Sequence, residues 1–552
     1  MKKRLYMLAL LAMPWLGACE DPLQVENFDN PDRDKVLATP ADLENWIRDS
    51  FNAWFRSAWS NDRLLPQMRT SGLENHSELA NFNMGPRYLI PRNLIENTRG
   101  APGTGENNGD FLAFSRAARS AAVGVAKLDA GTSIGTPASD ARARAFAHFV
   151  LGISLGYLSF VWDSSTVVAP GDDPEIAPPL VPYQDVNAAA IANLDEAESV
   201  ASANPAAFPI PSTWLRQPAD VSQAGFLRLV RSFRAQVRAG VARTPAERAA
   251  VDWAAVIADA SNGITGDFQI NADPNAGWSI SWFNNQFRPG SWHAMHQFML
   301  GPADTTGAFQ TWLNTPRGSK VQFLIQTPDR RFPPGATRTA QQSTPTSTSV
   351  LPAGRYFRNR PPGDDTQGDP LGNSMYDQYR FRAFFDNLRI GPFPIVTKAE
   401  IDLLAAEGYI RTSDWANAMA KINISRTAAG LPALVGMTSL NDPVPGGAAC
   451  VPRVPEFSSG AYQAVCGNIM EAMKWEKRME TGYTGYGNWF LDSRGWGDLP
   501  EGTALQWPVP WDEKDSRRAP FVTAVGGCTR LGTTESAGAS TYGSAISCTP
   551  AP

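Results

Sequence analysis

Residues 397–432, TKAEIDLLAAEGYIRTSDWANAMAKINISRTAAGLP, predict two helices joined by a short break. Thr397 and Glu400 have the spacing of a capping box, in which the two side chains satisfy free amides at a helix start. The break falls at 412–414, and the closing Gly-Leu-Pro is typical of a helix end. The predicted pair has the length of a tetratricopeptide repeat, about 34 residues.

Apolar side chains in this pair, 397–430, follow the helical period. The second helix carries a stripe with i, i+3, i+4, i+7 spacing, made of Trp415, Ala418, Met419 and Ile422. Ala405 and Gly408 on the first helix are small enough to let a neighbouring helix approach closely. We therefore expect Trp415 to lie in a helix–helix core.

Three earlier segments carry apolar stripes of the same kind. A helix opened by Pro40 contains Leu43, Trp46, Ile47, Phe51 and Trp54; a helix over 141–163, capped by Ser139, contains Phe146, Phe149, Val150, Ile153, Tyr157 and Phe160; and a helix pair over 222–262 contains Phe226, Leu229, Val230 and Phe233. The second helix of that pair opens with Thr244 as N-cap, Pro245 and the capping-box residue Glu247. His148 is interpreted as a structural histidine. The sequence predicts a mainly all-α fold built from helix pairs.

Two stretches between the helices read as loops. Residues 71–109 are rich in Asn and Gly, and residues 263–392 are rich in Gly, Pro, Asn and aromatic residues, with room for short strands only. So long an irregular stretch within a compact protein is usually functional. We expect ligand-binding residues to come mainly from 60–110 and 263–392.

The N-terminus reads as a lipoprotein export signal. Three basic residues precede a twelve-residue apolar stretch, 5–16, which is too short to span a bilayer of about 30 Å. Small residues then lead to Cys19, as in a bacterial lipobox, where the cysteine is acylated (palmitate) and becomes the first mature residue. Glu20 and Asp21 resemble an acidic export tag for the outer surface. The alternative is an ordinary secretory signal with an incidental cysteine.

Four further cysteines favour disulfides in an exported chain. Proximity in sequence favours pairing Cys450 with Cys466 and Cys528 with Cys548. A four-cysteine zinc site is the alternative, but the spacing lacks C-x-x-C.

Charge and composition narrow the classes of partner. The net charge is −5 with basic and acidic residues interspersed, so nothing indicates nucleic-acid binding. Seventeen Trp and 10 % aromatic residues stand beside only 19 % charged residues. Buried packing explains much of this, but sugar-binding proteins also expose aromatic platforms.

Motifs of catalysis and metal binding are weak. The sequence has no G-x-S-x-G, H-E-x-x-H or Walker-type loop, and no carboxylate pair sits in a recognisable motif, so no catalytic residue is assigned. His293 and His296 could form half of a metal site, but without a third ligand we interpret them as surface histidines. An acidic loop with Asp364, Asp365 and Asp369 suits calcium chemically, yet lacks EF-hand spacing; a solvated turn is the simpler interpretation, and no cofactor is predicted.

An aromatic run in the second loop suits a sugar ligand. Trp278, Trp282 and Trp292 are interleaved with amide and guanidinium groups, including Asn284 and Arg288. Aromatic planes cover the C–H face of a sugar while polar groups bond its hydroxyls. The same tryptophans could instead pack the loop against the helices.

The Asn-rich first loop is a second candidate wall of the ligand site, through Asn75, His76, Asn81 and Asn83.

Four segments, in order, resemble the SusD/RagB outer-membrane nutrient-binding lipoproteins. They are the lipobox followed by LQVEN at 23–27; GYL at 156–158 with WD at 162–163; PIVTKAE at 394–400 leading to INISR and AGLP; and WEKR at 475–478 with FLDSRGWG at 490–497. The family commonly has an acidic residue and a glycine where this chain has TGYTGY at 481–486, and the cysteine-bearing tail looks like an addition.

The resemblance implies a fold and a role. Four tetratricopeptide-like helix pairs would support a loop-rich ligand-binding half. The role would be non-enzymatic capture of oligosaccharides, or sometimes peptides, as a lid over a TonB-dependent outer-membrane transporter, on a lipid-anchored protein facing the exterior. The expected organisation is a signal peptide over 1–18, a lipidated linker over 19–40, a body over 41–514 and a polar tail over 515–552.

Two other functions stay open at this point. The chain could be an exported glycan hydrolase, or a structural helical-repeat adaptor lipoprotein. Turnover of a bound glycan would indicate the first, and binding to proteins alone the second.

Overall fold

The structure is a computed structural model that describes residue 37 and residues 39–60, 62–77, 79–90, 92–173, 176–282, 293–343, 351–361, 373–520 and 524–527. The export signal with Cys19, the second cysteine pair Cys528 and Cys548, and the acidic loop with Asp364, Asp365 and Asp369 lie outside the described residues. Helices dominate the described chain and the strands are short, so the all-α prediction is confirmed.

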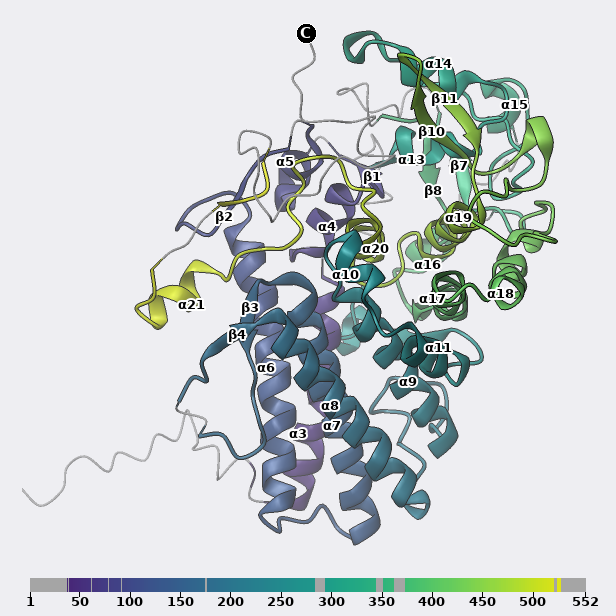
Figure 1. The fold of residues 1–552 in the computed structure, drawn as a ribbon. Helices are drawn as coiled ribbons and strands as arrows, with labels where there is room; N and C mark the ends of the chain where they lie inside the picture. Colours follow the sequence, from purple (N-terminus) through teal and green to yellow (C-terminus); the bar gives the residue numbers. More distant parts are fainter. Residues whose placement is uncertain are drawn as a thin grey trace, which may run out of the picture.

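One half of the molecule is helical (Figure 1). Its elements are α3 (Pro40–Ala58), α6 (Thr104–Asp129), α7 (Pro137–Val161), α8 (Tyr183–Ala203), α9 (Gln223–Gly240), α10 (Pro245–Ala249), α11 (Trp253–Ser261), α17 (Lys398–Arg411), α18 (Trp415–Ala428), α19 (Ile469–Thr481) and α20 (Asn488–Trp496). Long helices α3, α6, α7 and α8 run side by side, and α17 packs against α11, α18 and α19.

Helix α7 is the centre of this half. Its most apolar stretch is long enough to cross a membrane, with a mean hydropathy of 1.4, but 89 % of that stretch is buried inside the protein. Packing therefore accounts for its apolar character. Two glycines let its neighbours approach: a Cβ at Gly152 would lie 2.7 Å from Leu194 on α8, and one at Gly156 would lie 2.6 Å from Val237 on α9.

The predicted helix starts agree with the structure at two positions. The Thr397 hydroxyl accepts a hydrogen bond from the Glu400 amide at 3.1 Å, and the Thr244 hydroxyl accepts one from the Glu247 amide at 3.2 Å. At α7 the prediction was one turn late, because Thr136 is the N-cap and Ser139 is its capping-box partner. These contacts are local, which is why sequence spacing predicts them well.

Other helix predictions need correction. Helix α6 lies partly where a loop was expected, and the second helix of the 222–262 pair ends at Ala249 before restarting under an Asp252 cap. Trp415 is only partly buried, whereas Ala418 and Ile422 are fully buried. Close approach at Gly408 is confirmed, since a Cβ there would lie 2.7 Å from Ile257 on α11.

The other half is built from loops and short elements. Its helices are α4 (Leu65–Ser71), α5 (Met84–Tyr88), α13 (Gln297–Leu300), α14 (Ala308–Asn314), α15 (Arg338–Gln342) and α16 (Arg382–Asp386), while α21 (Trp511–Ser516) lies near the end of the chain. The 3-10 turns are η2 (Asn81–Asn83), η3 (Pro205–Ala207), η4 (Pro274–Ala276), η5 (Gly301–Ala303), η6 (Arg317–Ser319) and η8 (Gly447–Ala449).

The strands of the described chain form antiparallel pairs. These are β1 (Asn75–His76) with β6 (Ala294–Met295), β2 (Ile95–Glu96) with β12 (Ala524–Val525), β3 (Ser164–Thr166) with β4 (Leu180–Pro182), β5 (Phe268–Ala272) with β9 (Gly391–Val396), β7 (Phe357–Asn359) with β8 (Tyr376–Gln378), and β10 (Arg453–Ser458) with β11 (Ala461–Cys466). The β5–β9 pair brings together the two ends of the long irregular stretch.

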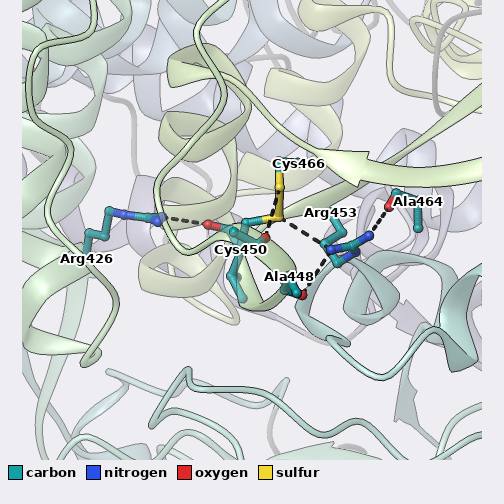
Figure 2. Close-up of a disulfide and its surroundings, with 8 residues drawn as sticks. Arg426, Ala448, Cys450, Arg453, Ala464 and Cys466 are labelled. Atoms are coloured by element: carbon teal, nitrogen blue, oxygen red, sulfur yellow. Dashed lines mark hydrogen bonds between the residues drawn. A yellow bond between two sulfur atoms is a disulfide. The ribbon is translucent and has the colours of Figure 1, made fainter.

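A disulfide lies at the base of the β10–β11 hairpin (Figure 2). It joins Cys450 to Cys466, the pairing that proximity in sequence favoured. Arg453 lies beside it and donates hydrogen bonds to the carbonyls of Ala448 and Ala464. The hairpin is therefore held at its open end by covalent and polar contacts together.

Candidate ligand-binding groove

A pocket of about 470 Å³ opens between α3, α6 and the segment 279–281. Its polar lining consists of Arg56, Ser57, Ser60, Asp62, Arg63, Arg116, Ser279 and Ser281, which we call the arginine–serine groove. It draws on both regions from which ligand contacts were predicted, because 60–63 begins the first and 279–281 belongs to the second. The lining offers hydroxyl and guanidinium groups, which can bond sugar hydroxyls.

The orientation of the aromatic run is set by alternation. In the segment Trp-Ser-Ile-Ser-Trp, residues 278, 280 and 282 are buried, while Ser279 and Ser281 line the groove. The alternating burial shows that the serines and the apolar residues of this segment lie on opposite sides of it. The polar members, rather than the aromatic ones, therefore face the ligand side.

Trp278 and Trp282 are core residues, which corrects their assignment as stacking platforms. Trp282 is 0 % exposed and lies beneath the Arg69 guanidinium, 4.7 Å from the ring centre. Trp278 is 9 % exposed and its ring lies 5.2 Å from that of Phe55 on α3. Protein atoms cover both tryptophan rings, so a sugar cannot stack on them.

The remaining predicted ligand residues fall into two groups. Trp292, Asn284 and Arg288 lie outside the described residues. Asn81 is exposed on η2, and Asn83 is buried at the start of α5, but neither is among the groove's described lining.

Arg63 is held in place at the floor of the groove. Its Nε lies 3.6 Å from Asp110 Oδ1, and its Nη1 lies 3.9 Å from Asp62 Oδ2. The guanidinium crosses α6 at Gly109, where a Cβ would come within 2.5 Å of Nη1. A residue larger than glycine at 109 would displace Arg63 from this position.

Asp110 supports the groove from below. It is fully buried and accepts hydrogen bonds from the Leu64 amide at 2.9 Å and the Tyr486 hydroxyl at 2.6 Å. Burial raises the pKa of Asp110 to about 7, although these bonds and the Arg63 charge favour its ionised form. Asp110 thus links α6 to the start of α4 and to the chain before α20, and it is too deeply buried to contact a ligand.

A second pocket, of about 390 Å³, is a weaker candidate. Its described lining comes only from residues 86–102, and its arginines donate hydrogen bonds to backbone carbonyls. Arg87 donates to the Leu94 carbonyl at 3.0 Å, and Arg92 donates to the Ser71 carbonyl at 2.8 Å. The arginine–serine groove combines distant segments and has exposed guanidinium groups, so we take it as the candidate site.

A solved SusD homologue from Parabacteroides distasonis matches this structure with a TM-score of 0.52, at 13 % identity, over 82 % of this chain and 84 % of its own. The surface glycan-binding protein A from Bacteroides uniformis matches with a TM-score of 0.51, at 14 % identity, over 88 % of this chain and 99 % of its own. This chain has the SusD fold. No protein-family model and no curated protein sequence matches it.

Within the SusD fold, strands β1 and β6 join the two loop regions. Asn75 pairs with Met295 and His76 with Ala294, and the Asn75 amide donates to His293 Nδ1 at 2.6 Å. The predicted surface position of the two loop histidines was wrong, because His293 is 2 % and His296 is 0 % exposed. Among the described residues, no group of three ligands could hold a metal ion.

These histidines are neutral in the folded protein. Burial, assisted by the positive charge of Arg360, lowers the pKa of His76 to about 3. Burial, together with Arg69, His76 and Arg360, lowers the pKa of His293 to about 3. A neutral His293 agrees with its Nδ1 accepting a hydrogen bond from the Asn75 amide.

The pH dependence of stability is expected to weaken in His293→Gln. The pKa of His293 in the folded protein lies below the ordinary 6.5, so below pH 6.5 the unfolded state binds a proton that the folded state excludes. Lowering the pH therefore lowers the stability of the folded protein. Between pH 7 and pH 5 this one side chain should cost about 2 kcal/mol. Urea denaturation of both proteins at the two pH values measures the difference. Equal losses in the two proteins would contradict a neutral, buried His293.

Some residues of the groove could have been predicted from the sequence, and others could not. The alternation of serine with apolar residues over 278–282 indicates that Ser279 and Ser281 face away from the tryptophans. Arg56 and Arg116 lie on the polar faces of two helices, where arginine is ordinary. Only the packing of α3 beside α6 reveals that they share a groove.

Proposed function

We propose that this protein captures oligosaccharides outside the cell and delivers them, uncleaved, to a TonB-dependent outer-membrane transporter. The main observation in support of this proposal is the arginine–serine groove, a polar cleft of about 470 Å³ formed by the helical half and both loop regions of a SusD fold. A surface glycan-binding protein shares this fold, which supports a glycan as the ligand.

The groove favours binding over hydrolysis. Glycosidases commonly use two carboxyl groups that flank the scissile bond. Among the described residues that line the groove, Asp62 carries the only carboxylate. Asp110, the nearest buried one, is closed off and bonded to Leu64 and Tyr486. The proposal therefore assigns no catalytic residue.

The export signal supports a lipid anchor at Cys19 on the outer membrane, facing outward. We expect Cys19→Ser to yield protein that is exported but no longer sediments with membranes, because acyl chains supply about 0.8 kcal/mol per buried CH₂. Fractionation of cells expressing the two forms measures this. A variant that stays firmly membrane-bound would contradict the anchor.

The released Cys19→Ser protein is also the material for testing the function. It is screened by calorimetry against neutral and acidic oligosaccharides and against peptides, and each mixture is then analysed by chromatography for cleavage. Binding of at least one oligosaccharide without cleavage supports the proposal. Cleavage would indicate a hydrolase, and absence of any glycan binding would exclude glycan capture. Co-purification with a TonB-dependent transporter from solubilised outer membranes tests the partner.

A further inference from the structure

The arginine–serine groove reverses the charge of the protein that surrounds it. The whole chain has a net charge of −5, yet the groove's described lining has three arginines and a single carboxylate. Arg56 comes from α3, Arg116 from α6 and Arg63 from the segment that follows α3. Distant parts of the chain thus bring cations to one site.

Two of these cations are available to a ligand. Arg56 and Arg116 are exposed, and neither has a carboxylate partner among the described residues. A guanidinium presents a planar fork of donors that matches a carboxylate or a sulfate with two parallel hydrogen bonds. Surface arginines that merely solubilise a protein are usually interspersed with acidic residues, whereas here one acid, Asp62, is shared with Arg63.

The third arginine, Arg63, and the serine hydroxyls are positioned by contacts within the protein. Arg63 lies between Asp110 and Asp62, and its buried Nε has no hydrogen-bond partner in the part of the chain that the structure describes. Across the groove, Ser60 Oγ lies 3.5 Å from Ser281 Oγ. Hydroxyls spaced in this way can bond the ring hydroxyls of a sugar whose charged group meets the arginines.

We propose that the groove selects acidic glycans, in which a uronate carboxylate or a sulfate ester is held between Arg56 and Arg116. This inference rests on the proposed function and specifies its class of ligand. The two anions share the chemistry of a planar or tetrahedral oxygen acceptor for guanidinium groups. Matched probes distinguish them.

The experiment compares charged oligosaccharides with uncharged counterparts. One pair is a galacturonate oligosaccharide and its methyl ester, which differ in the carboxylate; the other is a carboxyl-esterified chondroitin sulfate oligosaccharide and the same ester with its sulfates removed, which differ in the sulfate. We expect the charged member of at least one pair to bind about tenfold more tightly at low salt, with the advantage reduced at high salt. The pair that shows it identifies the anion.

The double substitution Arg56→Gln/Arg116→Gln should remove that advantage. Arg228→Gln/Arg231→Gln on α9, outside the groove's lining, is the control with the same change of charge. Both groove arginines are exposed, so the groove variant should keep the thermal midpoint of the parent protein. Circular dichroism checks this before affinities are compared.

Each outcome decides the inference. Loss of the charged preference in the groove variant alone supports it. Equal affinity for charged and uncharged members, or an equal loss in the control, overturns it while leaving glycan capture intact. If neither pair binds but a neutral glycan does, the acidic class is wrong; if no glycan of any kind binds, the proposed function fails as well.

Discussion

Arg331→Met is expected to lower the free energy of unfolding by about 3–5 kcal/mol, because it removes the cation that lies closest to a cluster of buried carboxylates. Arg331 donates to Asp329 at 2.7 Å and to Glu476 at 2.8 Å, and lies 3.3 Å from Glu480. Burial opposes its charge, but Asp329 and Glu476 outweigh burial and raise the pKa of Arg331 well above its usual value. The residue therefore ties the loop half to α19.

The matched control is Arg231→Met, since Arg231 pairs with Glu198 at 2.7 Å in a partly exposed position. Exposed pairs contribute at most about 1 kcal/mol, because solvent screens both charges. Urea denaturation at pH 7 measures both variants. Equal losses would show that the buried cluster around Arg331 is no stronger than a surface ion pair.

Trp54→Ala is expected to cost about 3–5 kcal/mol, because it opens a cavity between three helices. Trp54 is 1 % exposed, and its ring centre lies 5.1 Å from Tyr157 on α7 and 5.7 Å from Phe233 on α9. Its Nε1 has no hydrogen-bond partner among the described residues. Trp54→Phe should therefore cost only about 1–2 kcal/mol, because most of the ring remains and an unpaired buried donor is removed.

Trp415→Ala provides the comparison for that cavity. The sequence placed Trp415 in a helix–helix core, but the side chain is only partly buried, so we expect a loss of about 1–2 kcal/mol. Thermal or urea denaturation ranks the three variants. If Trp415→Ala cost as much as Trp54→Ala, partial burial would be a poor guide to this helix pair.

The charged run at 475–478 contributed to the family resemblance, but its structural role was not evident from the sequence. Lys477 donates to Asp492 at 2.8 Å, and Glu476 bonds Arg331 at the boundary with the loop half. Arg248 on α10 joins the same region by pairing with Glu407 at 2.6 Å. Charged residues in the segments that resemble the nutrient-binding family thus form buried ion pairs, and these pairs hold α19, α20 and the helix pairs together.

The sequence by itself determined the features that depend on near neighbours. Caps such as Thr397 need only the amide three residues on, and the apolar periods of α3 and α9 specify which face of each helix is buried. The order of four segments then sufficed to predict the SusD fold. Each cap and each apolar period lies within a short stretch of the chain, and only the order of the four segments draws on its whole length.

Only the tertiary structure decided the site. Whether Trp282 stacks on a sugar or packs under Arg69 depends on which face of its segment meets the core, and 69 and 282 are far apart in sequence. The groove likewise exists because α3, α6 and the segment 279–281 meet, bringing Ser60 within 3.5 Å of Ser281. Composition reports that aromatic and polar groups are present, but burial is a property of long-range packing, so the side on which each lies is settled when the helices and loops assemble.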